Sequence, residues 1–196
     1  MRTPNSELRA KARQSLSGQW GLGAVSTLIF TLIIGALAGT LLGFIIIAPV
    51  LAFGFYTLFL RSYRGADIEV GGIFDGFKNF GNVLATILLA YIYICLWSLL
   101  FVIPGIIKTY SYAMTPYILY DNPQLSADEA ICQSMEMMHG YKMKLFLLDL
   151  SFIGWIFLSV FTFGIGLFWL YPYIYSARAS FYEDLKQKAE QELYRR

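Results

Sequence analysis

The stretch QSLSGQWGLGAVSTLIFTLIIGALAGTLLGFIIIAPVLAFGFYTLFL, residues 14–60, contains no Asp, Glu, Lys or Arg in 47 consecutive positions. Two further uncharged stretches follow, 29 residues at 79–107 and 28 residues at 150–177. The hydrocarbon core of a bilayer is about 30 Å thick, and a helix needs about 20 apolar residues to cross it. A soluble fold of this size would need charged faces on such segments. The sequence therefore predicts an all-α integral membrane protein.

The composition agrees with this class of protein. Hydrophobic residues make up 57% of the chain and charged residues 14%, whereas soluble domains have about 45–50% and about 25%. The first apolar run is too long for a signal peptide, so we expect it to remain as a span. Cys95 lies in an apolar stretch and Cys132 in a polar one, so we expect no disulfide between them.

The apolar stretches divide into six predicted spans, paired in three hairpins of a polytopic helical bundle. The first run is too long for one helix at about 1.5 Å per residue, so we expect two helices with a turn between Gly39 and Pro49. The remaining spans are expected at about 81–103, 106–120, 145–163 and 167–182. Gly and Pro interrupt helices, and we assign the hairpin tips or kinks to Pro104, Gly105, Pro116, Gly164, Gly166 and Pro172.

A short amphipathic helix is expected before each hairpin, at the cytoplasmic interface. In residues 5–17, Leu8, Ala12 and Leu16 recur at spacing four, a pattern typical of a helix lying on a membrane surface. The segment IFDGFKNF, residues 73–80, has the same character. The third helix is expected at 127–139, because Ser126 and Glu129 have the spacing of a capping box.

These three units suggest an internal threefold repeat, 5–64, 65–121 and 122–185, within one integral membrane domain that covers residues 1–196. Parallel repeats of this kind pack around an axis along the membrane normal. Chance similarity among Gly-rich and aromatic-rich segments is the alternative explanation.

The positive charges predict the orientation. If the N-terminus is cytoplasmic and all six segments cross, the two termini and the loops 61–80 and 121–144 are cytoplasmic. These regions then hold every Lys and Arg except Lys108, with Arg178 counted at the end of a span. Cytoplasmic loops carry an excess of Lys and Arg. If 106–120 did not cross, Lys142 and Lys144 would face outward, which favours six spans over five.

Several elements resemble a known family. The segments LLFVIPGIIKTYSYAM (99–114) and SMEMMHGYK (134–142) are the more specific ones. Together with the rest of residues 5–185, they resemble a bacterial membrane-protein family known as domain-of-unknown-function family 975. The resemblance implies a multi-pass protein of the bacterial inner membrane with no established activity. It implies no catalytic or binding residues.

Two ionisable residues lie at membrane depth and are candidate site residues. Lys108 follows Pro104 by four residues, and Asp149 follows Lys144 by five. Ionisable groups inside a membrane are often functional. Alternatively, Lys108 extends to the outer interface, and Asp149 pairs with Lys142, Lys144 or Arg178. We expect Lys108 and Asp149 to lie toward opposite faces and not to pair.

Two further patterns concern packing and aromatic contacts. Gly35, Gly39 and Gly43 recur at spacing four, which is the small-residue pattern of close helix contacts. Their neighbour is either an internal helix or another protomer of a homo-oligomer. The segment YPYIY, residues 171–175, either lines a cavity with hydroxyl groups or forms part of an interfacial aromatic belt.

No enzyme motif occurs in the sequence, and His139 is the single histidine. We therefore expect no catalysis, no metal and no cofactor. Acidic residues balance the cations of the loops, so we expect no nucleic-acid partner, whereas the basic N-terminal helix suits anionic lipid. The leading hypothesis is a non-catalytic scaffold or accessory protein that binds a protein partner or organises lipid through its cytoplasmic helices. The alternative is a small transporter or transporter subunit, which needs a polar cavity where a scaffold would be solid and apolar.

Overall fold

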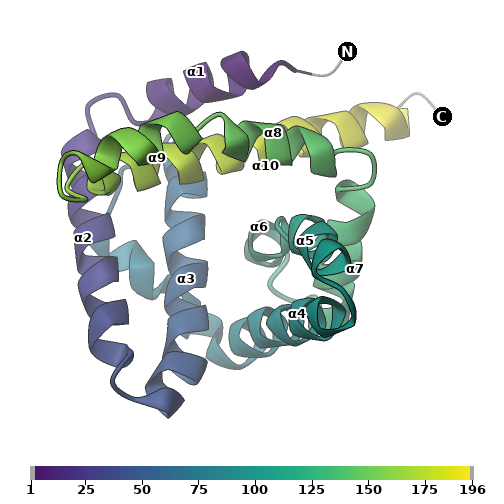
Figure 1. The fold of residues 1–196 in the computed structure, drawn as a ribbon. Coiled ribbons are helices and arrows are strands. Elements are labelled where there is room, and N and C mark those ends of the chain that lie inside the picture. The colour runs from purple at the N-terminus through teal and green to yellow at the C-terminus, as the bar shows by residue number, and fades with distance from the viewer. Residues whose placement is uncertain (1–2, 195–196) are drawn as a thin grey trace.

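A computed structural model describes residues 3–194, and all regular structure in that range is helical (Figure 1). Three segments are long and apolar enough to cross a membrane. They are α2 (Trp20–Leu37), α3 (Leu41–Tyr63) and Val70–Leu100, which joins the 3-10 helix η1 (Val70–Asn79) to α4 (Phe80–Leu100). The all-α fold is thereby confirmed. The count of six spans stays a prediction.

The remaining helices are mostly shorter than the predicted spans. They are α1 (Asn5–Ser15), α5 (Val102–Ser111), α6 (Thr115–Asp121), α7 (Ala127–Met137), α8 (Lys142–Leu150), α9 (Ile153–Val160) and α10 (Leu167–Tyr194). Pro116 lies in the first turn of α6, where its missing N–H costs no helical hydrogen bond. The predicted kink at Pro116 is therefore a break between α5 and α6. Pro172, by contrast, lies inside α10.

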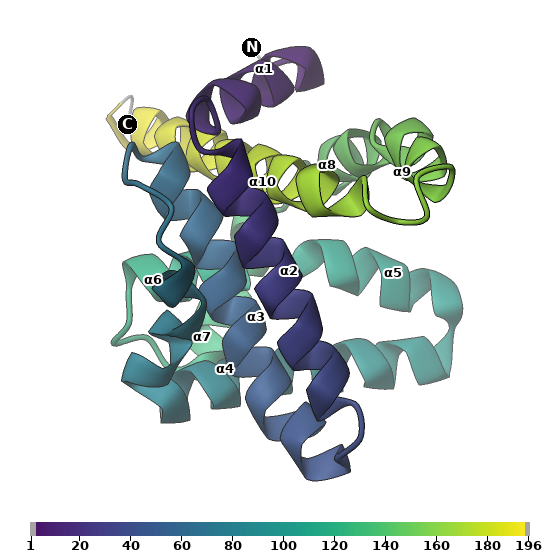
Figure 2. The same cartoon turned by 90° about the vertical axis from the view of Figure 1, so that its left-hand side faces the viewer.

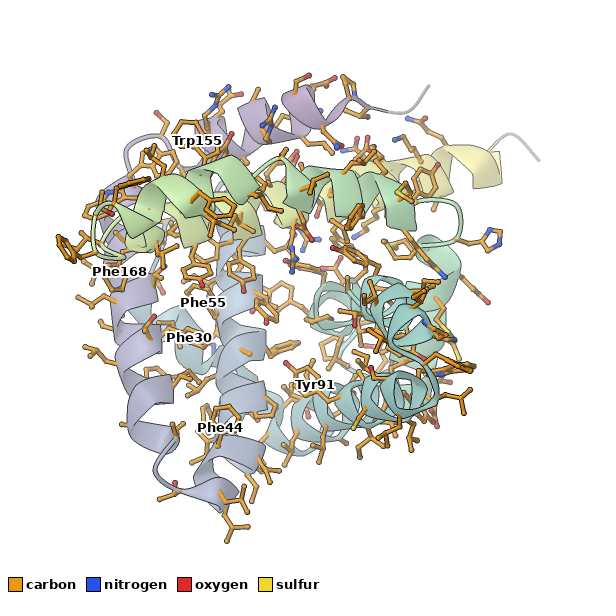
Figure 3. The ribbon with its side chains drawn as sticks, viewed as in Figure 1. Phe30, Phe44, Phe55, Tyr91, Trp155 and Phe168 are labelled. Atoms are coloured by element: carbon orange, nitrogen blue, oxygen red, sulfur yellow. The ribbon has the colours of Figure 1, made fainter. Side chains whose placement is uncertain are left out.

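The long helices run in three different directions. Figures 1 and 2 show that α2 and α3 run side by side, that α4 and α5 run across them, and that α8, α9 and α10 lie across one end. Stacking of Phe30 on Phe55, with ring centroids 4.4 Å apart, holds α2 against α3 (Figure 3). Three helix pairs, α2 with α3, α4 with α5, and α8 and α9 with α10, therefore diverge from a shared centre instead of forming one parallel bundle.

Contacts between helices follow a cyclic order. Among the short helices, α1 packs on α10, η1 packs on α3, and α7 packs on α4 and α6. Among the longer ones, α10 contacts α2, α3 contacts α4, and α5 contacts α8. The last helix is thus joined to the first two, and the chain closes on itself.

The apolar row of α1 is buried by the protein itself. Leu8, Ala12 and Leu16 are fully buried. Leu8 and Ala12 share a core cluster with Phe181 and Leu185 of α10. The expectation that this row rests on a membrane surface is therefore wrong for the folded protein, because α10 packs against Leu8 and Ala12, and α3 packs against Leu16.

The predicted glycine row contacts another helix of the chain at one of its three positions. A Cβ at Gly35 would have no atom within 4 Å, and one at Gly39 would meet only its own turn. Gly39 lies in the turn between α2 and α3, which occupies residues 38–40, at the edge of the expected interval. A Cβ at Gly43 of α3 would meet Thr40 of the turn and Leu37, the last residue of α2. Within the chain, the row therefore meets only the end of α2 in its own hairpin, and a contact with another protomer stays a prediction.

Close backbone contacts occur at other glycines. A Cβ at Gly54 of α3 would lie 2.0 Å from the Ile73 carbonyl oxygen of η1. A Cβ at Gly76 of η1 would lie 2.4 Å from the Val50 carbonyl oxygen of α3. These two glycines allow α3 and η1 to touch backbone to backbone.

The turns between the long helices are apolar and exposed. Leu41 is 76% exposed beside the first turn, Phe101 is 69% exposed between α4 and α5, and Phe163 is 99% exposed between α9 and α10. Pro104 and Gly105 follow Phe101 in the first turn of α5, and a Cβ at Gly105 would lie 2.1 Å from the Ser98 hydroxyl oxygen. Gly164 (φ +84°) and Gly166 lie in the turn 161–166.

Ion pairs join the helices at their opposite, polar ends. The Asp121 carboxylate accepts two hydrogen bonds from Arg64, at 2.6 and 2.8 Å, and one each from Lys186 and Tyr182. Burial alone would raise the pKa of Asp121, but these hydrogen bonds outweigh burial and lower the pKa to about 2. The cluster ties α6 and the end of α3 to α10. The predicted capping box at Ser126 is present at the start of α7.

Candidate functional site: a tyrosine-lined cavity

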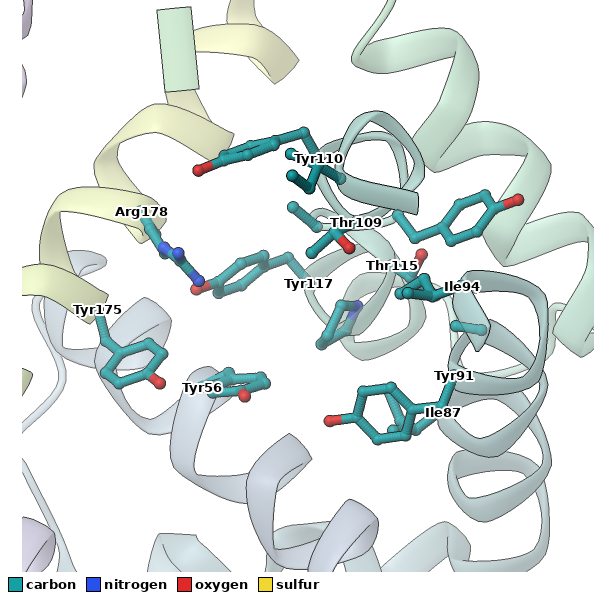
Figure 4. A pocket seen from close by; sticks show the side chains of 15 residues that line it. Tyr56, Ile87, Tyr91, Ile94, Thr109, Tyr110, Thr115, Tyr117, Tyr175 and Arg178 are labelled. Carbon is teal, nitrogen blue, oxygen red and sulfur yellow. The ribbon is translucent and has the colours of Figure 1, made fainter. Parts of the chain in front are cut away.

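A cavity of about 260 Å³ lies between α3, α4, α5, α6 and α10 (Figure 4). Aliphatic side chains form part of its wall. The polar groups come from Tyr56, Tyr91, Thr109, Tyr110, Tyr112, Thr115, Tyr117, Tyr175 and Arg178. The diverging helix pairs create this space, because they meet at an angle and cannot close along their full length.

The two ends of the cavity differ in exposure and in polarity. At the inner end, Thr115 is 1% exposed and Tyr117 is 2% exposed. At the mouth, Tyr91 is 47% exposed and Ile106 is 50% exposed. The cavity therefore opens onto the apolar surface of the molecule and has Thr115 and Tyr117 at depth.

Arg178 of α10 borders the cavity and is held by Asp149 of α8. The guanidinium donates from Nε to Oδ1 at 3.1 Å and from Nη2 to Oδ2 at 2.8 Å. Such a bidentate pair fixes the plane of the guanidinium as well as its position. The structure thus selects Arg178 from the three partners considered for Asp149.

Aromatic stacking orients the tyrosines on the α10 side. The Tyr175 ring stacks on that of Tyr56, with centroids 4.9 Å apart, and meets Phe55 edge to face at 5.1 Å. Both tyrosine hydroxyls face the cavity (Figure 4). Within the YPYIY segment, Tyr175 lines the cavity, whereas Tyr171 stacks on Tyr175 and Tyr173 packs on Trp20.

Thr115 contributes a polar group without a partner. Thr115 lines the cavity, and its Oγ1 is buried and makes no hydrogen bond within the described part of the chain. A buried hydroxyl left unpaired costs about 1–3 kcal/mol. A bound molecule with a hydrogen-bonding group would remove that cost.

Lys108 lies outside this cavity. Its Nζ lies 4.9 Å from the centroid of the Trp97 ring and 3.6 Å from the Met135 sulfur of α7. Aromatic faces stabilise a cation by about 0.5–1 kcal/mol at exposed sites. Lys108 and Asp149 are therefore not brought together, and Lys108 connects α4, α5 and α7.

Sequence reasoning missed the cavity residues Tyr56, Tyr110 and Tyr117. The available signal was a set of hydroxyl groups inside otherwise apolar segments, most densely at 110–120. Across residues 3–194, no group of three or more His, Cys, Asp and Glu side chains is arranged to hold a metal ion. Both cysteines are free and exposed.

A model of the family described as "Protein of unknown function (DUF975)" matches residues 1–111 and 99–189 of the chain. These matches confirm the resemblance inferred from the sequence over nearly the whole chain. No curated protein and no solved structure matches it. The family description names no activity, so the geometry of the chain is the basis for any functional proposal.

Proposed function

Since the chain belongs to the DUF975 family, we propose a function from its own geometry: it is a non-catalytic membrane protein that binds a small amphipathic molecule in the tyrosine-lined cavity. One observation carries this proposal. The same cavity has buried hydroxyl groups at its inner end, at Thr115 and Tyr117, and an exposed apolar mouth at Ile106.

The two ends suit the two parts of an amphipathic molecule. A polar group at the inner end lies beside Thr115, whose hydroxyl is unpaired, and beside the fixed Arg178 guanidinium. An apolar chain leaves through the mouth, where each buried CH₂ contributes about 0.8 kcal/mol. The volume is slightly below the roughly 300–1,000 Å³ of typical ligand pockets. It therefore suits a headgroup or a short chain better than a whole phospholipid.

The placement in the membrane is part of the proposal. The three helix pairs enter the bilayer of a bacterial inner membrane from the cytoplasmic face with their apolar turns leading. The exposed Leu41, Phe101 and Phe163 at these turns support this direction of entry, as does the excess of cations at the opposite ends. The six-span topology with both termini cytoplasmic belongs to this proposal. Because the pairs diverge (Figures 1 and 2), they enter with different tilts.

The cyclic helix contacts support the threefold repeat as a further part of the proposal. Each short helix packs on a helix of the preceding unit, and α1 of the first unit packs on α10 of the last. Three units of one design closing into a ring would produce this order of contacts.

The cavity also bears on the two hypotheses that the sequence leaves open. A scaffold that only organises partners or lipid needs no internal polar space, whereas a transporter does. The transporter, or transporter subunit, is therefore the second candidate. The specific observation in its favour is the Arg178–Asp149 pair, which borders the cavity between α8 and α10. Opening this pair would give a bound molecule a second exit.

Filling the cavity tests ligand binding. Ala90 lines it and is 6% exposed, so Ala90→Phe occupies part of the space. Ala36→Phe makes the same change on the exposed side of α2 and is the matched control. Native mass spectrometry of the protein extracted from membranes reports bound small molecules. We expect them with the wild type and with Ala36→Phe, and not with Ala90→Phe.

Overpacking costs about 1–3 kcal/mol, so the folding of Ala90→Phe is checked by its unfolding temperature. Thr115→Val is a second variant, which removes the hydroxyl and nearly keeps the volume. Wild-type protein free of any small molecule, or full retention in folded Ala90→Phe, would contradict the proposal.

Transport has a separate test through the ion pair. In a Cys95→Ser, Cys132→Ser background, a cysteine placed at Tyr117 reports access to the inner end of the cavity. We expect Asp149→Asn to increase its labelling by an impermeant thiol reagent applied from the cytoplasmic side. Equal labelling with and without Asp149→Asn would rule out this exit.

A further inference from the structure

We propose that a second site, a groove walled by Trp20, Trp155 and Trp169, binds an anionic phospholipid. The groove has a volume of about 360 Å³ and lies between α2, α9 and α10. Arg13, at the end of α1, is the charged residue among those that line it. The groove is separate from the tyrosine-lined cavity and shares no lining residue with it.

The groove has an apolar end and a cationic end. Thr162 and Gly166 mark one end, in the turn 161–166 that carries the 99% exposed Phe163. Trp20, at the start of α2, marks the other end, beside Arg13. The order from exposed apolar turn to tryptophans to cation matches the order of acyl chain, interface and headgroup in a phospholipid. Tryptophan is enriched at that interface.

The cation at this end is available for a headgroup. Arg13 is exposed and has no carboxylate within 4.0 Å in the part of the chain that the structure describes. Arg9 lies one turn earlier on the same helix and likewise has no such partner among residues 3–194. Basic residues next to a membrane surface attract anionic lipid.

A lipid fits the groove better than a protein segment does. The Ser159 hydroxyl donates to the Trp155 carbonyl, and the Thr162 hydroxyl donates to the Ser159 carbonyl. These hydroxyls are therefore already satisfied by backbone groups of α9 and of the turn that follows it. A peptide in the groove would bring backbone N–H and C=O groups that need partners, whereas an acyl chain needs none.

Tryptophan fluorescence reports on this groove directly. The chain has four tryptophans, and Trp97→Phe leaves the three that wall the groove. This variant is reconstituted in phosphatidylcholine vesicles that contain a minor fraction of brominated phosphatidylglycerol or, for comparison, brominated phosphatidylcholine. Bromine quenches a tryptophan that it contacts. We expect the brominated phosphatidylglycerol to reach half-maximal quenching at an about fivefold lower lipid fraction than the brominated phosphatidylcholine. This ratio corresponds to a difference of ~1 kcal/mol in binding free energy, as expected for one cation.

Two further variants assign the preference to Arg13. Arg13→Gln should remove the preference for the anionic lipid, because the change eliminates the cation on an exposed side chain and leaves the tryptophans in place. Lys142→Gln removes one positive charge elsewhere and should keep it. Ala90→Phe should also keep it, so failure of this proposal is distinguishable from failure of the proposed function. Equal quenching by the two lipids, or a preference that survives in folded Arg13→Gln, would overturn the proposal.

Discussion

Gly54→Ala tests the backbone contact between α3 and η1. The added Cβ would lie 2.0 Å from the Ile73 carbonyl oxygen and 2.6 Å from its carbon. Ordinary van der Waals contact begins at 3.4 Å, so α3 and η1 must separate by about 1.4 Å. The obstructing atoms belong to the backbone and cannot rotate away. The shift would also loosen Leu58 and Ile73, which are buried together. Overpacking costs about 1–3 kcal/mol, and a gain of up to about 1 kcal/mol in helix propensity partly offsets it.

Gly35→Ala is the matched control, because the same substitution in α2 meets no atom within 4 Å. It should stabilise the protein by about 0.5–1 kcal/mol. Thermal unfolding of both variants in one detergent, followed by circular dichroism, gives the comparison. For a chain of this size, 1 kcal/mol corresponds to roughly 2–4 °C. We expect Gly54→Ala to unfold several degrees below the wild type and Gly35→Ala slightly above it. If Gly54→Ala unfolds at or above the wild-type temperature, α3 and η1 do not touch through their backbones.

Three further predictions concern single side chains. Asp121 has a pKa of about 2 in the folded protein and about 3.9 when unfolded. The ionised Asp121 carboxylate therefore adds up to about 2 kcal/mol to the free energy of unfolding above pH ~4, and this contribution is lost as the pH falls toward 2. When the unfolding temperature is measured across this pH range, the corresponding decrease should be absent in Asp121→Asn. Ser126→Ala should cost about 1 kcal/mol and increase hydrogen exchange in the first turn of α7, whereas Ser126→Asp should retain the cap. Lys108→Met should lower stability by no more than about 1 kcal/mol, and Lys108→Glu by more, because a carboxylate is repelled by the face of Trp97; a large loss in Lys108→Met would show that its ammonium has another role.

The helical class and many helix ends could be predicted because they depend on local chemistry. Uncharged stretches indicate helices, Gly and Pro indicate turns, and a hydroxyl three residues before a Glu indicates a cap. The turn at 161–166 and the capped start of α7 at Ser126 are examples. Each depends on residues within one or two turns of the chain.

Breaks inside the predicted spans were harder to place. The segment 145–163 was predicted as one helix, but α8 ends at Leu150 and α9 begins at Ile153. The Ser151 hydroxyl donates to the Leu148 carbonyl at 2.6 Å. Serine can bond to its own backbone in this way and compete with regular helix. The serine was visible in the sequence, but its effect depends on the packing around it.

Contacts between distant segments could not be predicted from spacing. The Gly35–Gly39–Gly43 row has the periodicity of a packing face but meets only the end of α2 at Gly43, whereas Gly54 and Gly76 have no such periodicity and bring the backbones of α3 and η1 together. The tyrosine-lined cavity depends on the angle at which α3, α6 and α10 meet. That angle is a tertiary property, and the sequence carries no local signal for it.

The contact between α1 and α10 also has a consequence for biosynthesis. About 150 residues separate the end of α1 from the start of α10. At a translation rate of about 5–20 residues per second, the ribosome needs roughly 8–30 s to make them. During that delay, Leu8 and Ala12 lack the α10 part of their buried cluster, which includes Phe181 and Leu185, although both are fully buried in the folded state. An amphipathic row of this kind binds a bilayer surface reversibly. Nascent α1 would then wait on the membrane until α10 emerges and displaces the lipid, so the last helix to be synthesised would complete the ring.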